Sequence, residues 1–291
     1  MIIYQDKLLY PEILWQRPIN TSQKRGRVFI LGGEKDFRQL LFFCEILQQT
    51  LVAKIGLGYP KTIPKTIENL LPQEMRYPLS GRGGVLSTAA LSSLKTLLSS
   101  FDLFVLGVGL SKNSQTRMLI RNTLALPCPI LFYGEGIISF EPYLYQERKA
   151  PSFLVLEPSV LALWLRENVN KVQSALLPYF SRFIEKLQGN QDHCFVCSTV
   201  VSDRLFIIAG RKGSVVVTTA PNRSQTKSSF PKEIVSLGLL TAFLVQNLRK
   251  PFEAIATASY LFAKWQTDMT QKQDLQKVIT KIEKELDEKK S

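Results

Sequence analysis

The sequence is poor in the residues that build disulfide scaffolds and metal centres. Its 291 residues include four cysteines and one histidine. Four cysteines are too few to cross-link a chain of this length, which excludes a disulfide-rich scaffold. His193, Cys194 and Cys197 are three metal-type ligands close together, but no second Cys/His pair completes a zinc site. We therefore predict no metal site.

Long apolar runs are also missing. The longest, Ile234–Val245, is too short to cross a bilayer. The first ten residues contain Asp6 and Lys7 and have no long apolar run, so they do not resemble a signal peptide. We expect no membrane association and a cytoplasmic location.

Basic residues outnumber acidic ones by 37 to 24, which gives a net charge of +13. They are scattered, apart from a small cluster at Arg17, Lys24, Arg25 and Arg27. No basic helix and no alternation of basic and aromatic residues appears, so we predict no nucleic-acid surface. Anionic metabolites such as nucleotides suit this charge.

Short apolar segments alternate with helical patterns along the chain. Strands are expected over residues 27–31, 51–57, 103–106, 130–133 and 153–156, and a helix over 37–49. A strand pair is expected over 205–209 and 215–218, followed by two largely buried helices over 234–247 and 252–265. The alternation predicts an α/β fold, a three-layer α/β/α sandwich with a mostly parallel central sheet.

Three regions are predicted. Residues 1–23 form an N-terminal arm, residues 24–266 the α/β domain, and residues 267–291 a charged helix with one apolar face. That last helix is expected to dock on the domain or on a partner helix.

Small or acidic residues follow four of the predicted strands. They are Gly32 and Gly33, Gly107 and Gly109, Glu135 between two glycines, and Glu157 before Pro158 and Ser159. Carboxyl ends of parallel strands meet at one edge of a sheet, so these segments are predicted to converge on one crevice. The Gly-Val-Gly turn at 107–109 has two interpretations: a phosphate-binding backbone, or a tight turn without a ligand.

Several motifs, in this order, carry a resemblance to a known family. They are RGRVFILGG (25–33), PQEMRYPL (72–79), DLFVLGVGL (102–110), LEPS (156–159) and the helix LTAFLVQ (240–246). Together they resemble the NAD(P)H-hydrate dehydratases, which have a ribokinase-like fold, over roughly Lys24 to Trp265. The resemblance implies ADP or ATP as a cofactor, with Mg²⁺ as a possible companion, a hydrated NADH or NADPH as substrate, and a homo-oligomer.

The sequence differs from this family at the positions of the family's catalytic and phosphate-binding residues. The family's Gly-Thr-Gly-Asp motif, an anion hole with a catalytic Asp, is replaced by the glycine-free segment 229–234. Glu233 in that segment is the available carboxylate, or an ordinary acidic residue of a helix's first turn. Glu157 stands where the family has His, and Tyr133 and Glu135 stand where it has two Asp residues. Arg211 and Lys212 lie near the position of the family's Lys and are candidates to face a phosphate.

Three functions remain open on this basis. The first is a divergent member of the family that binds a nucleotide, or a protein partner, with weakened or lost catalysis, and we favour it. The second is an active ADP- or ATP-dependent dehydratase with Glu233 as its base. The third is a small-molecule kinase of the same fold, which also needs Glu233. In each nucleotide-binding case Gly32, Gly33, Gly107, Gly109, Glu135 and Glu157 are expected to line the crevice.

Overall fold

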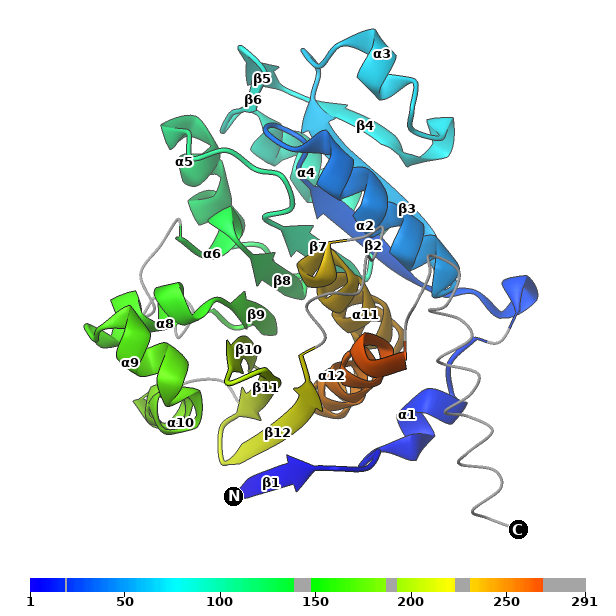
Figure 1. Cartoon of the computed structure of the whole chain (residues 1–291). Coiled ribbons are helices and arrows are strands. Elements are labelled where there is room, and N and C mark those ends of the chain that lie inside the picture. The colour runs from blue at the N-terminus through cyan, green and yellow to red at the C-terminus, as the bar shows by residue number, and fades with distance from the viewer. Residues whose placement is uncertain (19, 139–147, 187–192, 223–230, 269–291) are drawn as a thin grey trace.

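One large sheet organises the structure. The computed structural model describes residues 1–18, 20–138, 148–186, 193–222 and 231–268. In these residues ten strands lie in the spatial order β1-β12-β11-β10-β9-β8-β7-β2-β3-β4 (Figure 1). The strands are β1 (Ile2–Gln5), β2 (Arg25–Leu31), β3 (Val52–Pro60), β4 (Arg76–Leu79), β7 (Leu103–Leu106), β8 (Ile130–Tyr133), β9 (Ser152–Leu156), β10 (Cys194–Val201), β11 (Arg204–Arg211) and β12 (Ser214–Pro221).

The sheet is parallel except around one strand. β11 runs antiparallel to both of its neighbours, β10 and β12, and the other described neighbours run parallel. A separate short hairpin is formed by β5 (Gly81–Arg82) and β6 (Val85–Leu86). The predicted mostly parallel α/β sheet is confirmed, and so is the predicted strand pair at β11 and β12.

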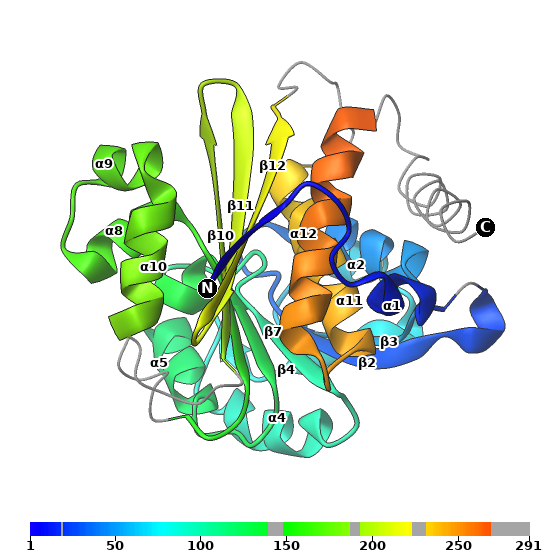
Figure 2. The same cartoon turned by 90° about the horizontal axis from the view of Figure 1, so that it is seen from below.

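Helices cover both faces of the sheet. One face carries α1 (Pro11–Trp15), α2 (Phe37–Gln49), α11 (Lys232–Gln246) and α12 (Pro251–Asp268), as Figures 1 and 2 show. The other face carries α4 (Ala90–Leu98), α5 (Ser114–Thr123), α8 (Pro158–Leu165), α9 (Val169–Ser174) and α10 (Leu176–Lys186). Two short helices, α3 (Lys65–Glu68) and α6 (Glu135–Ile138), lie in connections. The three-layer sandwich is confirmed.

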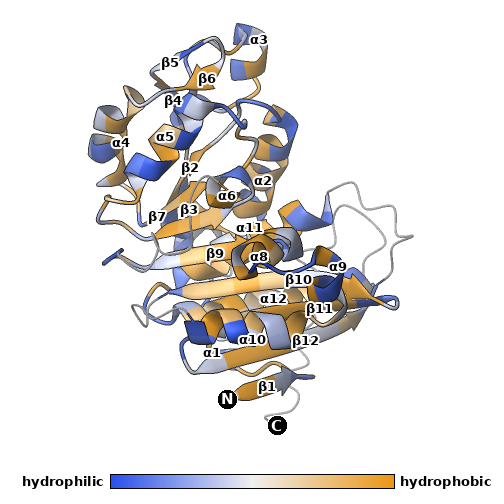
Figure 3. Cartoon of the chain, turned by 90° about the vertical axis from the view of Figure 1, so that its left-hand side faces the viewer, coloured by the Kyte–Doolittle hydropathy of each residue, from blue (hydrophilic) through white to orange (hydrophobic). Residues whose placement is uncertain are grey.

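Side-chain alternation along the strands builds two separate cores. In β2, Val28 and Ile30 join the cluster under α2, α11 and α12, while Phe29 and Leu31 join the cluster on the opposite face. Successive residues of a strand point to opposite faces, and a sheet covered on both sides therefore needs continuous apolar strands. Figure 3 shows the central strands coloured largely as hydrophobic, with hydrophilic residues on helices such as α4 and α5.

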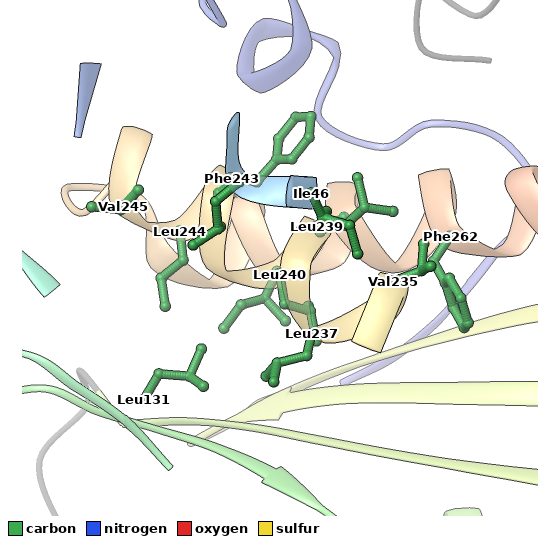
Figure 4. Close-up of a cluster of buried hydrophobic side chains, with 14 of the residues drawn as sticks. Ile46, Leu131, Val235, Leu237, Leu239, Leu240, Phe243, Leu244, Val245 and Phe262 are labelled. Atoms are coloured by element: carbon green, nitrogen blue, oxygen red, sulfur yellow. The ribbon is translucent and has the colours of Figure 1, made fainter. Parts of the chain in front are cut away.

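Helix α11 is buried around nearly its whole circumference. Every residue from Ile234 to Gln246 except Ser236 is buried. Figure 4 shows Leu237 and Leu240 on its side toward the strands, with Leu239 on the side near Ile46 of α2. The helix contacts α2, α12 and β2, so it forms the centre of the first core.

The N-terminal segment joins this sheet. β1 pairs in parallel with β12, with Ile2 opposite Val215, and α1 buries Ile13 and Leu14. At the other end α12 continues to Asp268, three residues past the predicted helix end. Of the predicted C-terminal helix, residues 269–291 lie outside the described residues, and the three-region division stays a prediction.

In the described part of the chain, no helix combines the length and apolarity needed to span a membrane.

Because α11 is central, we expect that shortening one of its buried side chains lowers the free energy of unfolding. Leu237 is fully buried, and Leu237→Ala should lower the free energy of unfolding by about 2–5 kcal/mol, since lost burial and a cavity both contribute. Leu163→Ala on α8 is the control, because Leu163 is 67% exposed and should change stability by less than about 0.5 kcal/mol. Urea unfolding measures both, and equal losses would contradict the central placement of α11.

Candidate functional site

The glycines at the strand ends serve close approach of backbone to backbone. Gly107 has φ +125°, and a Cβ there would lie 1.6 Å from the carbonyl oxygen of Tyr133. A Cβ on Gly32 would lie 2.1 Å from the carbonyl oxygen of Val108. The carbonyl of Gly109 accepts hydrogen bonds from the amides of Glu34 and Lys35, at 3.0 and 2.8 Å. The ends of β2, β7 and β8 are therefore packed against one another.

Glu34 closes this region further. Its Oε1 accepts from the amide of Leu86 (2.6 Å) and the hydroxyl of Thr116 (2.7 Å). Its Oε2 accepts from the amide (2.8 Å) and the hydroxyl (2.7 Å) of Ser111. One carboxylate thus joins the end of β2 to the β5–β6 hairpin and to the start of α5. The sequence offered no signal for this role, because the donors come from segments more than 50 residues away.

A cavity lies farther along the same edge of the sheet. It has a volume of about 380 Å³ and lies at the carboxyl ends of β8, β9, β10 and β12, between the start of α11 and the end of α12. We call it the site cavity. It is lined by Tyr133, Val155, Leu156, Glu157, Pro158, Ser198, Thr199, Val200, Leu205, Asn222, Lys232, Glu233, Ser236, Phe262 and Gln266. Ligands of open α/β sheets bind beyond this edge, which makes the cavity the candidate site.

A second, smaller cavity has no such chemistry. It measures about 180 Å³ and lies between Leu176–Pro178 and the antiparallel strands, and none of the described residues that line it is charged.

Two of the predicted site residues meet at the site cavity. Glu157 precedes α8, and Glu233 lies in the first turn of α11. Burial raises the pKa of Tyr133 to about 12, and the charges of Glu157 and Glu233 add to the increase. Tyr133 therefore keeps its proton at neutral pH and presents a hydroxyl donor beside two carboxylates.

Gln266, a residue of the cavity lining, has a buried acceptor without a partner. Its side chain is 5% exposed, and its Oε1 has no hydrogen-bond partner in the described structure. A buried polar atom without a partner costs about 1–3 kcal/mol, so such atoms need an explanation.

Arg211 and Lys212 lie at the opposite end of the strands from the site cavity. β11 is antiparallel, so its last residues sit beside the first residues of β10 and β12. There the Arg211 guanidinium lies 3.6 Å from a carboxylate oxygen of Glu253 and 4.7 Å from the ring centre of Phe252. The structure places neither residue at the end of the strands where the predicted glycines and carboxylates lie.

Glu135 lies at the same end of the strands as the site cavity but is not one of the residues that line it. It begins α6, and its Oε1 lies 3.7 Å from the Nζ of Lys112. Gly33, with φ +79°, packs against the ring of Phe37. Neither residue contributes to the wall of the site cavity.

His193, Cys194 and Cys197 do not converge. Cys194 and Cys197 lie on β10 and enter the two cores on opposite faces of the sheet. The Nδ1 of His193 accepts from the amide of Ser152 at 3.1 Å. Burial raises the pKa of the Cys197 thiol. Strand geometry, with its alternation of faces, separates ligands that are near in sequence.

The comparisons with known proteins bear on the fold. No family model matches the sequence, and no curated protein matches it significantly. Among solved structures, an ADP/ATP-dependent NAD(P)H-hydrate dehydratase from Bacillus subtilis, co-crystallised with ATP and Mg²⁺, matches with a TM-score of 0.67 at 13% identity. That match covers 97% of this chain and 99% of the other.

Two further structures are similar. A ribokinase-like superfamily protein from Enterococcus faecalis matches with a TM-score of 0.65 at 15% identity, covering 99% of this chain and 96% of the other. Ribokinase from Cryptococcus neoformans, in complex with ADP, matches with a TM-score of 0.52 at 11% identity, covering 89% and 99%. The resemblance drawn from the sequence is confirmed at the level of the fold, and the chain has a ribokinase-like fold.

The packing role of Gly107 predicts a large effect of one methyl group. Gly107→Ala should lower the free energy of unfolding by more than about 4 kcal/mol, because strained backbone and a backbone clash coincide. Gly84→Ala is the control: it has φ +79°, yet nothing lies within 4 Å of its Cβ position, so the loss should be about 1 kcal/mol. Thermal unfolding compares them, and similar losses would show that the clash can relax.

The vacant acceptor predicts a substitution that stabilises. Gln266→Leu should raise the free energy of unfolding by about 1 kcal/mol without ligand, because it removes an unsatisfied buried oxygen. Gln246→Leu is the matched control: Gln246 is 9% exposed, and its amide donates to the carbonyl of Thr50 at 2.9 Å. That variant should lose about 1–3 kcal/mol. Equal losses in urea unfolding would mean that Gln266 has a partner.

Proposed function

We propose that this protein binds an adenine nucleotide, ADP or ATP, in the site cavity and has lost efficient dehydratase catalysis. The observation that carries the proposal is the position of the cavity, at the carboxyl ends of β8, β9 and β10 and at the start of α11. Similar proteins of this fold have been crystallised with ATP and Mg²⁺ or with ADP. The volume of about 380 Å³ is in the range of small-molecule sites.

The lost catalysis is argued from the start of α11. Phosphoryl chemistry depends on positioned groups that neutralise the phosphates. Here the residue before the helix is Pro231, which has no backbone N–H to donate to a phosphate. Among the described residues of the cavity lining, Lys232 is the one cation, against the two carboxylates of Glu157 and Glu233.

The residues fit a Mg²⁺–phosphate group poorly. Mg²⁺ commonly uses one or two carboxylates together with phosphate oxygens and water, and the two carboxylates alone would suffice. The helix start beside them has no glycine, however, and glycine lets backbone amides approach a phosphate closely because it has no Cβ. Within the described residues, no three His, Cys, Asp or Glu side chains gather as metal ligands. We therefore propose binding without a metal-dependent step.

Nucleotide binding is tested by thermal stability. ATP or ADP at about 100 times its dissociation constant should add about 2.7 kcal/mol of stability and raise the Tm by roughly 5 °C. Ser236→Trp fills the cavity from α11 and should remove the shift, because Ser236 lines the wall. Ser93→Trp, at an exposed position on α4, is the matched control and should keep it.

Three outcomes would contradict the proposal. An absence of any shift with ADP, ATP or AMP would mean that the fold has been kept without its nucleotide. ATP- or ADP-dependent recovery of NADH from its hydrate, abolished by Glu233→Gln and retained by the exposed control Glu185→Gln, would favour the active dehydratase. Phosphorylation of a small molecule with the same dependence on Glu233 would favour the kinase.

A further inference from the structure

The two edges of the large sheet are protected differently. At one edge, β4 contains Arg76 and Pro78, and a positive charge and a proline both discourage the pairing of a further strand. At the other edge, β1 lies beyond β12 (Figures 1 and 3). There Ile2 and Tyr4 are 48% and 65% exposed, and the strand Ile2–Gln5 contains no proline and no charged residue. Within the described residues, no strand pairs with the outer side of β1.

The backbone of β1 offers hydrogen-bonding groups at this outer side. The carbonyl of Met1 accepts from the amide of Val215 at 2.9 Å, so Met1 faces β12. The N–H and C=O groups of successive strand residues point to opposite sides of the strand. Ile3 therefore also faces β12, while Ile2 and Tyr4 direct their N–H and C=O groups outward. The outer side of β1 is thus a template for a further strand.

The side chains of Ile2 and Tyr4 continue an apolar groove. Tyr4 lines the cavity of about 180 Å³ together with residues that include Leu176, Pro178 and Phe206. Ile2 and Tyr4 are two residues apart in a strand, so their side chains point to the same face of the sheet. Exposed apolar side chains that adjoin an apolar groove are typical of a protein–protein contact.

We propose that this edge binds a second copy of the chain, with the two β1 strands antiparallel and related by a two-fold axis at Ile3. Ile2 of each copy then lies opposite Tyr4 of the other, and the outward N–H and C=O groups of these residues bond in pairs. Their apolar side chains meet as cross-strand pairs. The large sheet continues through both copies with no free edge between them, so assembly through this edge stops at the dimer.

Charges beside β1 favour the same arrangement. Asp6 follows the strand and Lys212 lies in the turn before β12, and both are exposed. The terminal amine of Met1 donates to the carbonyl of Gly213 at 2.9 Å, which places that turn at the start of β1. In antiparallel pairing the end of one β1 lies beside the start of the other, so Asp6 of each copy comes near Lys212 of the other copy. A second copy is therefore complementary to this edge in charge as well as in backbone geometry.

Sedimentation velocity of the full chain tests the dimer. Over about 1–200 µM we expect a reversible monomer–dimer equilibrium with a dissociation constant in the micromolar range, because the contact is small. Tyr4→Lys should weaken the dimer at least about tenfold, since it places a charge in the apolar cross-strand pair. Leu163→Lys on α8 is the matched control, because Leu163 is 67% exposed and the variant adds the same charge on another element. Both variants should keep the Tm of the unsubstituted chain within about 2 °C.

Cysteine cross-linking tests the register. The two Ile3 residues form a non-hydrogen-bonded pair with Cα atoms about 4.5 Å apart, a separation that suits a disulfide. Ile3→Cys should therefore cross-link the dimer under mild oxidation. Ile2→Cys should not, because its two copies lie farther apart along the strands. The unsubstituted chain with its four cysteines gives the background, and the Tm of each reduced variant checks its folding.

Three results would overturn the proposal. One is a monomer at every concentration. Another is a dimer that survives Tyr4→Lys, because its interface would then lie elsewhere, for example at residues 269–291. The third is cross-linking of Ile2→Cys in place of Ile3→Cys, or of neither variant, which would contradict the two-fold axis at Ile3.

Discussion

The contact between the ends of β2, β7 and β8 is the constraint on which the rest of the site depends. At Gly107 the backbone of one strand end lies against the carbonyl of Tyr133 with no room for a Cβ, and Glu34 ties two further segments to the same place. In the sheet order, β2 and β7 are the neighbours between which the direction of winding reverses. Such a switch point commonly opens a ligand crevice. Here the backbone fills the switch point, and the site cavity lies farther along the sheet, at the ends of β8, β9 and β10.

The core and the site cavity use different residues of one helix. Helix α11 supplies both the centre of a core and one wall of the site. Its buried residues continue to Gln246, while Lys232, Glu233 and Ser236, in its first turns, line the cavity. Changes at these positions leave the packing against α2 and β2 untouched. A change of residues at the start of α11 is therefore compatible with the intact sandwich, since functional sites are grafted on folds.

The sequence was sufficient for most of the architecture. Apolar runs predicted β2, β7, β8 and β9 to within two residues, and helical periodicity placed α2 at its observed bounds. Strand β10 was missed because its two cysteines were considered as ligands, although the β-branched residues from Val196 to Val201 signal a strand.

The site was harder to predict than the fold. Glu157 and Glu233 could be singled out from neighbouring motifs, but their meeting at one cavity depends on how β9 and α11 are placed in space. The positions of Arg211 and Lys212 follow from the antiparallel direction of β11. Its last residues lie at the end of the sheet where the parallel strands begin. Gln266 had no signal at all, because a vacant acceptor arises only where a helix end meets other elements.

The pairing of β1 with β12 has a consequence for synthesis on the ribosome. β1 is made long before Ser214 begins its partner strand. At translation rates of about 5–20 residues per second, roughly 10–40 s pass before the two can pair. During that interval Ile2 and Tyr4, which stay largely exposed even in the folded protein, belong to an unpaired strand. The sheet can therefore be completed at this edge only late in synthesis, from the C-terminal side of the chain.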